Sequence, residues 1–140
     1  ISLTGVDTLP ASVGSINGRD TALVLPVEAS KVYLVRVFLF GNNGNGIKYA
    51  LMCPAGSTIT GWMSYNQSST HSRQEITAID TFGSLTMTTN GALCEIWARL
   101  KTSTTPGNVT VKFGSTIDNT QSHLYAGSSL VIHEIDGGEV

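Results

Sequence analysis

The chain has 140 residues, the length of a single domain, and 8 basic against 10 acidic side chains give it a net charge of -2. This balance offers no cationic surface to nucleic acid or to an anionic membrane, so we expect neither as a partner. Only 13% of the residues are charged, about half the usual share, and the remainder is rich in hydroxyl and amide groups, which is typical of extracellular proteins and of subunits packed in assemblies.

The apolar pattern has the two-residue period of β-strands along almost the whole chain, and no repeat or linker divides it. We therefore predict an N-terminal arm over residues 1–20 and one domain over 21–140. The predicted strands are 22–27, 32–40, 47–52, 58–65, 84–89, 93–101, 108–114 and 124–135, with a break in the last at Gly127. Short turns rich in Gly, Asn and Pro, such as TNG at 89–91, connect them. The predicted fold class is all-β, an antiparallel β-sandwich of the jelly-roll type with about eight strands.

The segment 66–83 (NQSSTHSRQEITAIDTFG) departs from this pattern because its polarity is high. We predict a long loop here that contacts the core through Ile76 and Ile79. A single helical turn is the alternative, because SRQE at 72–75 has the spacing of a capping box.

No group of residues has the spacing of a catalytic or metal site. His71, His123 and His133 are far apart in sequence and form no metal-binding motif. Cys53 and Cys94 lack a CxxC pairing, so we expect two buried thiols, with a disulfide between them as the alternative. The acidic residues are scattered singly, without the paired carboxylates of glycosidases. We therefore expect no enzymatic activity, no metal and no cofactor.

Two further segments lack the context that a ligand or a membrane would require. The glycines of GNNGNG at 41–46 are followed by a predicted strand and not by a helix, so we interpret them as a hairpin loop and not as a phosphate site. The apolar run 32–40 is shorter than the roughly 20 residues of a membrane helix. The chain begins at Ile1 without a methionine or a signal peptide, so we expect a fragment or a processed product.

The strand predicted at 32–40 has no polar face. Its alternation places Tyr33, Val35, Val37 and Leu39 on one side and Val32, Leu34, Arg36, Phe38 and Phe40 on the other. The strands at 93–101 and 128–135 also lack a cleanly polar face, and Trp97 lies between charged neighbours on its outward side. A sandwich of this length covers only one face of each strand, so we predict that another subunit of a homo-oligomer covers the second.

Exposed aromatic side chains beside amides are common on the sugar-binding surfaces of β-sandwiches. The segment 61–69 (GWMSYNQSS) offers such a set, and the candidate ligand surface comprises Trp62, Tyr65, Asn66 and Gln67. The alternative is that Trp62 and Trp97 are core or subunit contacts.

Two segments carry a resemblance to a known family. LPVEASKVYLVRVFLFGNNGNGIKYALMCPAGSTI at 25–59 and YAGSSLVIHEI at 125–135 resemble a domain of structural proteins in tailed bacteriophages. The resemblance spans about residues 20–136, although the segment 66–83 matches nothing in it. It implies a trimeric jelly roll of the tumour-necrosis-factor-like type, used in head decoration proteins, head fibres and tail-associated knobs, and it carries over no catalytic residue.

Such trimers pack one sheet of each subunit along a three-fold axis lined by aromatic and aliphatic side chains. The candidate subunit interface that the resemblance implies comprises Tyr33, Arg36, Phe38, Phe40, Tyr49, Trp97 and Tyr125. Arg36 is the one charge among the residues 32–40, and we expect it to pair with Glu95 or Glu134, within the subunit or across its boundary.

The expected function is that of a virion protein, a homotrimeric head decoration, cement or head-fibre knob whose partners are other virion proteins, such as the major capsid protein. The alternative is a receptor-binding module of a tail fibre, with tail proteins and a host surface glycan as partners. A free-standing carbohydrate-binding module or a cytokine-like ligand is a third interpretation.

Overall fold

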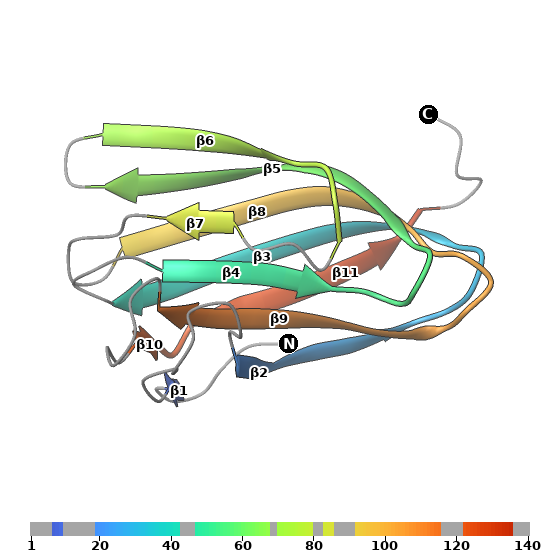
Figure 1. Cartoon of the computed structure of the whole chain (residues 1–140), viewed down its shortest axis with the longest axis horizontal. Helices are drawn as coiled ribbons and strands as arrows, with labels where there is room; N and C mark the ends of the chain where they lie inside the picture. Colours follow the sequence, from blue (N-terminus) through green and yellow to red (C-terminus); the bar gives the residue numbers. More distant parts are fainter. Residues whose placement is uncertain are drawn as a thin grey trace.

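Two antiparallel β-sheets pack face to face in the computed structural model of the chain, which describes residues 7–9, 19–42, 47–67, 70–79, 83–85, 92–115 and 122–135 (Figure 1). These residues form strands and connecting turns, without a helix. The strands are β1 Asp7–Leu9, β2 Arg19–Val27, β3 Val32–Asn42, β4 Ile47–Met52, β5 Thr58–Gln67, β6 Thr70–Ile76, β7 Gly83–Leu85, β8 Ala92–Lys101, β9 Gly107–Ser115, β10 Ser122–Leu124 and β11 Ser129–Glu134. The predicted all-β sandwich is therefore confirmed.

Strands β2 to β9 form a long hairpin that is folded over on itself. Strand β5 pairs with β6 at its tip, and the nested pairs β4 with β7, β3 with β8 and β2 with β9 follow outward. Folding this long hairpin over brings β5 beside β8 and β4 beside β9. The result is the two sheets β3-β8-β5-β6 and β2-β9-β4-β7. This connectivity is that of a jelly roll. Strands β1, β10 and β11 extend the first sheet, called the large sheet below, beyond β3.

The segment 122–135 follows the prediction closely. A turn between Tyr125 and Ser128 separates β10 from β11, and the Ser128 N–H donates a hydrogen bond to the Tyr125 carbonyl oxygen at 3.2 Å. Gly127 within this turn has a φ of 93°, a value that residues with a Cβ atom rarely adopt. The predicted break at Gly127 is therefore confirmed, and its cause is the left-handed turn.

The largest error of the sequence-based prediction concerns strand β6. The segment 66–83 is not a long loop and has no helical turn at 72–75, because Thr70–Ile76 pairs with β5 as an antiparallel strand. Its residues Arg73, Gln74 and Glu75 are exposed, so the strand lacks the apolar alternation that identified the others. A charged strand at the border of a sheet is a common protection against pairing with another chain. Of the strand predicted at 84–89, residues 84 and 85 lie in β7, and 86–89 lie outside the described residues.

The core lies between the sheets and takes alternate side chains from both. Its largest fully buried members are Leu23, Leu39, Met63, Ile96, Leu100, Phe113 and Leu130. Tyr33 and Tyr49 also belong to it, with only 6% and 3% of their surface exposed. These two tyrosines were candidates for the subunit interface, and that prediction is wrong for both because the subunit's own core covers their rings.

Strands β5 and β8 approach each other unusually closely at Gly61. A Cβ atom at this position would lie 2.2 Å from the Trp97 carbonyl oxygen and 2.6 Å from the Cα atom of Ala98. The glycine therefore sets the spacing of the two central strands, which carry Trp62 and Trp97.

Candidate functional site

The exposed apolar side chains of the described residues gather on one surface. Every large apolar side chain among them that is exposed lies on the large sheet, on the side that faces away from the small sheet β2-β9-β4-β7, and these are Leu34, Phe40, Trp62, Trp97 and Val131. Their exposed fractions run from 36% to 48%. We call this side of the large sheet the outer face. Exposed apolar residues that are scattered singly need no explanation, whereas a set gathered on one face marks an interaction surface.

The centre of the outer face is one row of four side chains that runs across four strands. Val131 of β11 lies opposite Arg36 of β3, Arg36 lies opposite Trp97 of β8, and Trp97 lies opposite Trp62 of β5. Residues directly opposite on antiparallel strands have Cβ atoms about 4.5 to 5.5 Å apart, so neighbours in this row are within reach of one another. We call these four residues the central row.

Two guanidinium groups lie over the tryptophan rings. The Cζ atom of Arg36 is 3.8 Å from the centroid of the Trp97 ring and 5.3 Å from that of the Phe38 ring. The Cζ atom of Arg73, on β6, is 4.0 Å from the centroid of the Trp62 ring. A contact of this kind stabilises by about 0.5 to 1 kcal/mol at exposed sites. One side of each indole is thus covered by a cation.

The polar contacts of Arg36 are incomplete within the subunit. Its Nε atom is buried without a hydrogen-bond partner in the described part of the chain. The pair with Glu134 that we predict within the subunit does not form. The Oε1 atom of Glu134 instead lies 2.6 Å from Lys31 Nζ. Glu95 is one step along the same face, opposite Phe38, and the described residues show no ion pair between it and Arg36. Both intramolecular pairs predicted for Arg36 are therefore wrong, and the intermolecular one stays a prediction.

The remaining interface candidates have different positions. Phe38 is half-buried on the outer face, and Phe40 is exposed there. Tyr125 lies in the turn before β11, where its N–H donates a hydrogen bond of 2.8 Å to the Phe40 carbonyl oxygen. Of the seven candidates, Arg36, Phe38, Phe40 and Trp97 share the outer face.

The candidate sugar-binding residues do not form one surface. Trp62 points outward from β5, whereas Tyr65 lies on the opposite side of the strand and packs against the core. Side chains three positions apart on a strand face opposite ways, so this separation follows from the two-residue period. Asn66 and Gln67 stand opposite His71 and Thr70 at the end of the β5–β6 hairpin. The aromatic neighbour of Trp62 is Trp97, which sequence reasoning did not join to it because the two belong to strands far apart in the chain.

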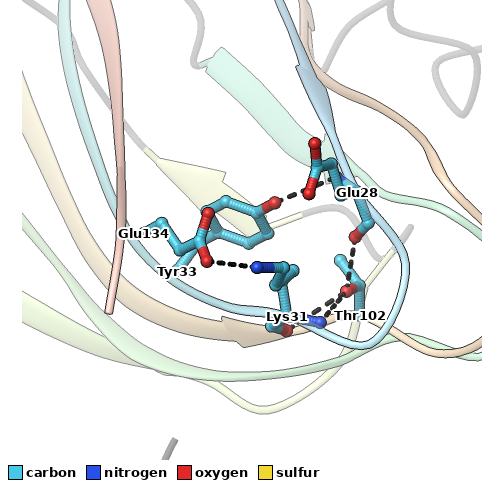
Figure 2. Close-up of polar contacts among 5 residues, drawn as sticks. All are labelled: Glu28, Lys31, Tyr33, Thr102 and Glu134. Carbon is cyan, nitrogen blue, oxygen red and sulfur yellow. Dashed lines mark hydrogen bonds and ion pairs between the residues drawn. The ribbon is translucent and has the colours of Figure 1, made fainter. Parts of the chain in front are cut away.

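Apart from the outer face, a cluster of polar side chains lies at the end of the sandwich where β2 is connected to β3 (Figure 2). The buried Thr102 hydroxyl donates a hydrogen bond of 2.7 Å to the Glu28 carbonyl oxygen and accepts one of 2.9 Å from the Lys31 N–H. The Tyr33 hydroxyl accepts a hydrogen bond of 2.9 Å from the Glu28 N–H. The ion pair with Glu134 raises the pKa of Lys31. These contacts connect the turn after β2, the turn after β8 and β11 to one another, which is a structural role.

Cys94 is buried as predicted, whereas Cys53 is only partly buried, so the prediction of two buried thiols is wrong for Cys53. Cys53 and Cys94 form no disulfide with each other, so the alternative of a disulfide is wrong. Burial raises the pKa of the Cys94 thiol to about 12, which keeps this thiol protonated and unreactive at neutral pH.

The described ranges offer little support for other kinds of site. They contain no group of three His, Cys, Asp or Glu side chains that could hold a metal ion. No helix in this part of the chain is long and apolar enough to cross a membrane. The outer face is therefore the candidate functional site.

No protein-family model, no curated protein and no solved structure matches the chain.

Proposed function

We propose that the chain is a structural protein of a tailed-bacteriophage virion, a homotrimeric jelly-roll knob that decorates the head and stabilises the capsid surface without catalysis. The observation that carries the proposal is the outer face, where the exposed apolar side chains of the described residues are concentrated. An apolar sheet face of this kind is costly to leave in water, so it favours a subunit that works in an assembly. The jelly-roll topology and the motifs at 25–59 and 125–135 support the same proposal.

The mechanism of such a protein is mass action. A knob that binds only the assembled shell, through contacts with the major capsid protein, stabilises that shell in proportion to its occupancy. A low density of charged side chains suits this task, because each charge buried at a contact has to be paired or desolvated at a cost.

A glycan-binding module of a tail fibre is the second candidate, and Trp62 and Trp97 side by side on the outer face favour it. Sugars bind aromatic residues by stacking on the faces of the rings. Here a guanidinium group covers one face of each indole, and Tyr65 lies on the other side of β5. The structural knob is therefore the better-supported proposal.

Binding to virus particles tests the proposal. Purified protein is added to heads of the encoding phage from which the gene has been deleted, and bound copies are counted after sedimentation. We expect saturation at a fixed number of copies per shell and a shell that resists heat better than the bare one. If the protein leaves such heads bare and instead binds host polysaccharide on a glycan array, with the binding lost in Trp62→Ala, the tail-fibre function replaces the proposed one.

A further inference from the structure

We infer that the outer face is the surface through which copies of this chain bind one another, and that Arg36 pairs there with Glu95 of the partner subunit. The inference deepens the proposed function, since it rests on the protein being a homo-oligomer. It adds the identity of the interface and the ion pair that sets its register.

The apolar area of the outer face is of the size that a subunit contact needs. Large side chains offer roughly 150 to 250 Å² each, so five of them at 36% to 48% exposure present on the order of 400 Å². A stable interface buries about 800 Å² on each partner, of which about 65% is apolar in homodimers. These five side chains would supply most of that apolar share. A patch of this size also occurs on monomers, so the choice depends on the charges that accompany it.

Two charges of the outer face, those of Arg36 and Glu95, are complementary to the same two charges of a second copy. Arg36 lies opposite Trp97, and Glu95 lies opposite Phe38, so the two charged groups are diagonal neighbours. Within the described subunit they form no ion pair, because the guanidinium lies over the Trp97 ring. Around a three-fold axis, Arg36 of each subunit can meet the Glu95 side chain of the next subunit, so each copy offers one cation and one anion to the ring.

The state of Arg36 agrees with a partner that binds from outside. Its Nε atom is buried and lacks a hydrogen-bond acceptor, so a carboxylate from outside would meet the guanidinium through the Nη atoms, with a charge-assisted bond. Stacking on Trp97 and Phe38 also restricts the side chain before binding, which lowers the entropy lost in the contact.

Other ways of association fit the surface less well. Addition of a strand at β6 would place a partner beside the exposed, charged residues Arg73 and Glu75, which disfavour pairing of edges. A neutral glycan would leave Arg36 and Glu95 without partners. A second copy satisfies the apolar and the charged residues together.

Tryptophan fluorescence tests the inference directly, because Trp62 and Trp97 are the two tryptophans of the chain and both lie on the outer face. Emission and acrylamide quenching are followed during dilution, in parallel with mass by sedimentation. We expect the emission to shift to the red and quenching to rise as the oligomer dissociates. If the oligomer dissociates while emission and quenching stay unchanged, the inference is wrong and the proposed trimer stands. A monomer at all concentrations would overturn the trimer itself.

Charge exchange tests the ion pair. Arg36→Glu and Glu95→Arg are each expected to raise the dissociation constant of the oligomer by about tenfold or more, and the double variant R36E/E95R to restore most of the loss. Glu28→Arg is the control, because its side chain is exposed at the loop end, away from the outer face. Circular dichroism shows whether each variant is folded. If R36E does not fold, Val131→Lys adds a charge at the most exposed apolar position of the face and is expected to abolish the oligomer. Unchanged dissociation constants in the folded variants would refute the inference.

Discussion

The guanidinium group of Arg36 lies 3.8 Å from the centroid of the Trp97 ring, on the strand directly beside it. This contact explains how an arginine can occupy the otherwise apolar outward side of β3, since the indole takes the place of a carboxylate as the group that meets the cation. It also holds the Trp97 ring in position at the centre of the outer face. The energy of the contact can be measured separately from any role in association.

A double-mutant cycle of Arg36→Ala and Trp97→Ala should give a coupling energy of about 0.5 to 1 kcal/mol. The measurement is urea unfolding at a protein concentration where sedimentation shows a monomer. The matched control is Arg73→Ala with Trp97→Ala, because Arg73 stacks on Trp62 instead. Equal coupling in the two cycles would contradict the specific Arg36–Trp97 contact.

Gly61→Ala is expected to lower the free energy of unfolding by about 1 to 3 kcal/mol. The added methyl group would lie 2.2 Å from the Trp97 carbonyl oxygen, so β5 and β8 would have to separate. Thr58→Ala, at an exposed position of the same strand, should change stability by no more than about 0.5 kcal/mol. Chemical denaturation compares them, and a Gly61→Ala variant as stable as the control would argue against the close approach of the strands.

Thr102→Val should destabilise the fold by about 1 to 3 kcal/mol, because it removes the hydroxyl that binds the Glu28 carbonyl oxygen and the Lys31 N–H. The valine keeps the shape of the side chain, so the loss reports on the hydrogen bonds and not on packing. Thr102→Ser keeps the hydroxyl and is expected to retain most of the stability. Thermal unfolding of the three proteins tests this, and a valine variant as stable as the wild type would show that the cluster is dispensable.

Alkaline pH should destabilise the protein in part through Cys94. Burial raises the pKa of its thiol to about 12, above the value of about 8.5 to 9 in an unfolded chain. A raised pKa in the folded state means that the stabilising contribution is complete below pH 8.5 and declines as the pH rises toward 12, since only the unfolded thiol ionises in this range. A Cys94→Val variant should therefore show a weaker loss of stability between pH 8.5 and 10.5.

Thiol labelling at pH 8 gives an independent measurement of the same environment. Cys94 should react in the native protein only as fast as the chain unfolds, while the partly exposed Cys53 reacts sooner. Labelling of Cys94 at the rate of Cys53 would contradict its burial.

The jelly roll could be predicted from the sequence because local signals mark its strands. Neighbouring residues are enough to indicate the strand at 32–40 and the break at Gly127, and both are confirmed. Strand β6 could not be found in this way, because a border strand with Arg73, Gln74 and Glu75 exposed needs no apolar period.

The candidate site was predictable only in part. The alternation along β3 separates Tyr33 from Phe38 and Phe40, but nothing local shows which of its two apolar faces meets the core. The interface set that the resemblance implies takes residues from both faces. The pairing of Trp62 with Trp97 depends on the register of β5 against β8. Register between distant strands follows from the packing of the whole sandwich and is not encoded in either strand alone.

The nested hairpin has a consequence for the kinetics of folding. The pair β5 and β6 is joined by a short connection, whereas β2 and β9 enclose the six strands β3 to β8. Closing a chain loop costs more entropy as the loop lengthens, so we expect pairing to start at the β5–β6 tip and to proceed outward, with β2 against β9 last. A chain that folds in this order keeps the apolar side chains of β3 and β8 in water until its late steps. Dilute conditions and low temperature should then favour refolding over aggregation, because the same tryptophan-bearing strands are exposed in the intermediates.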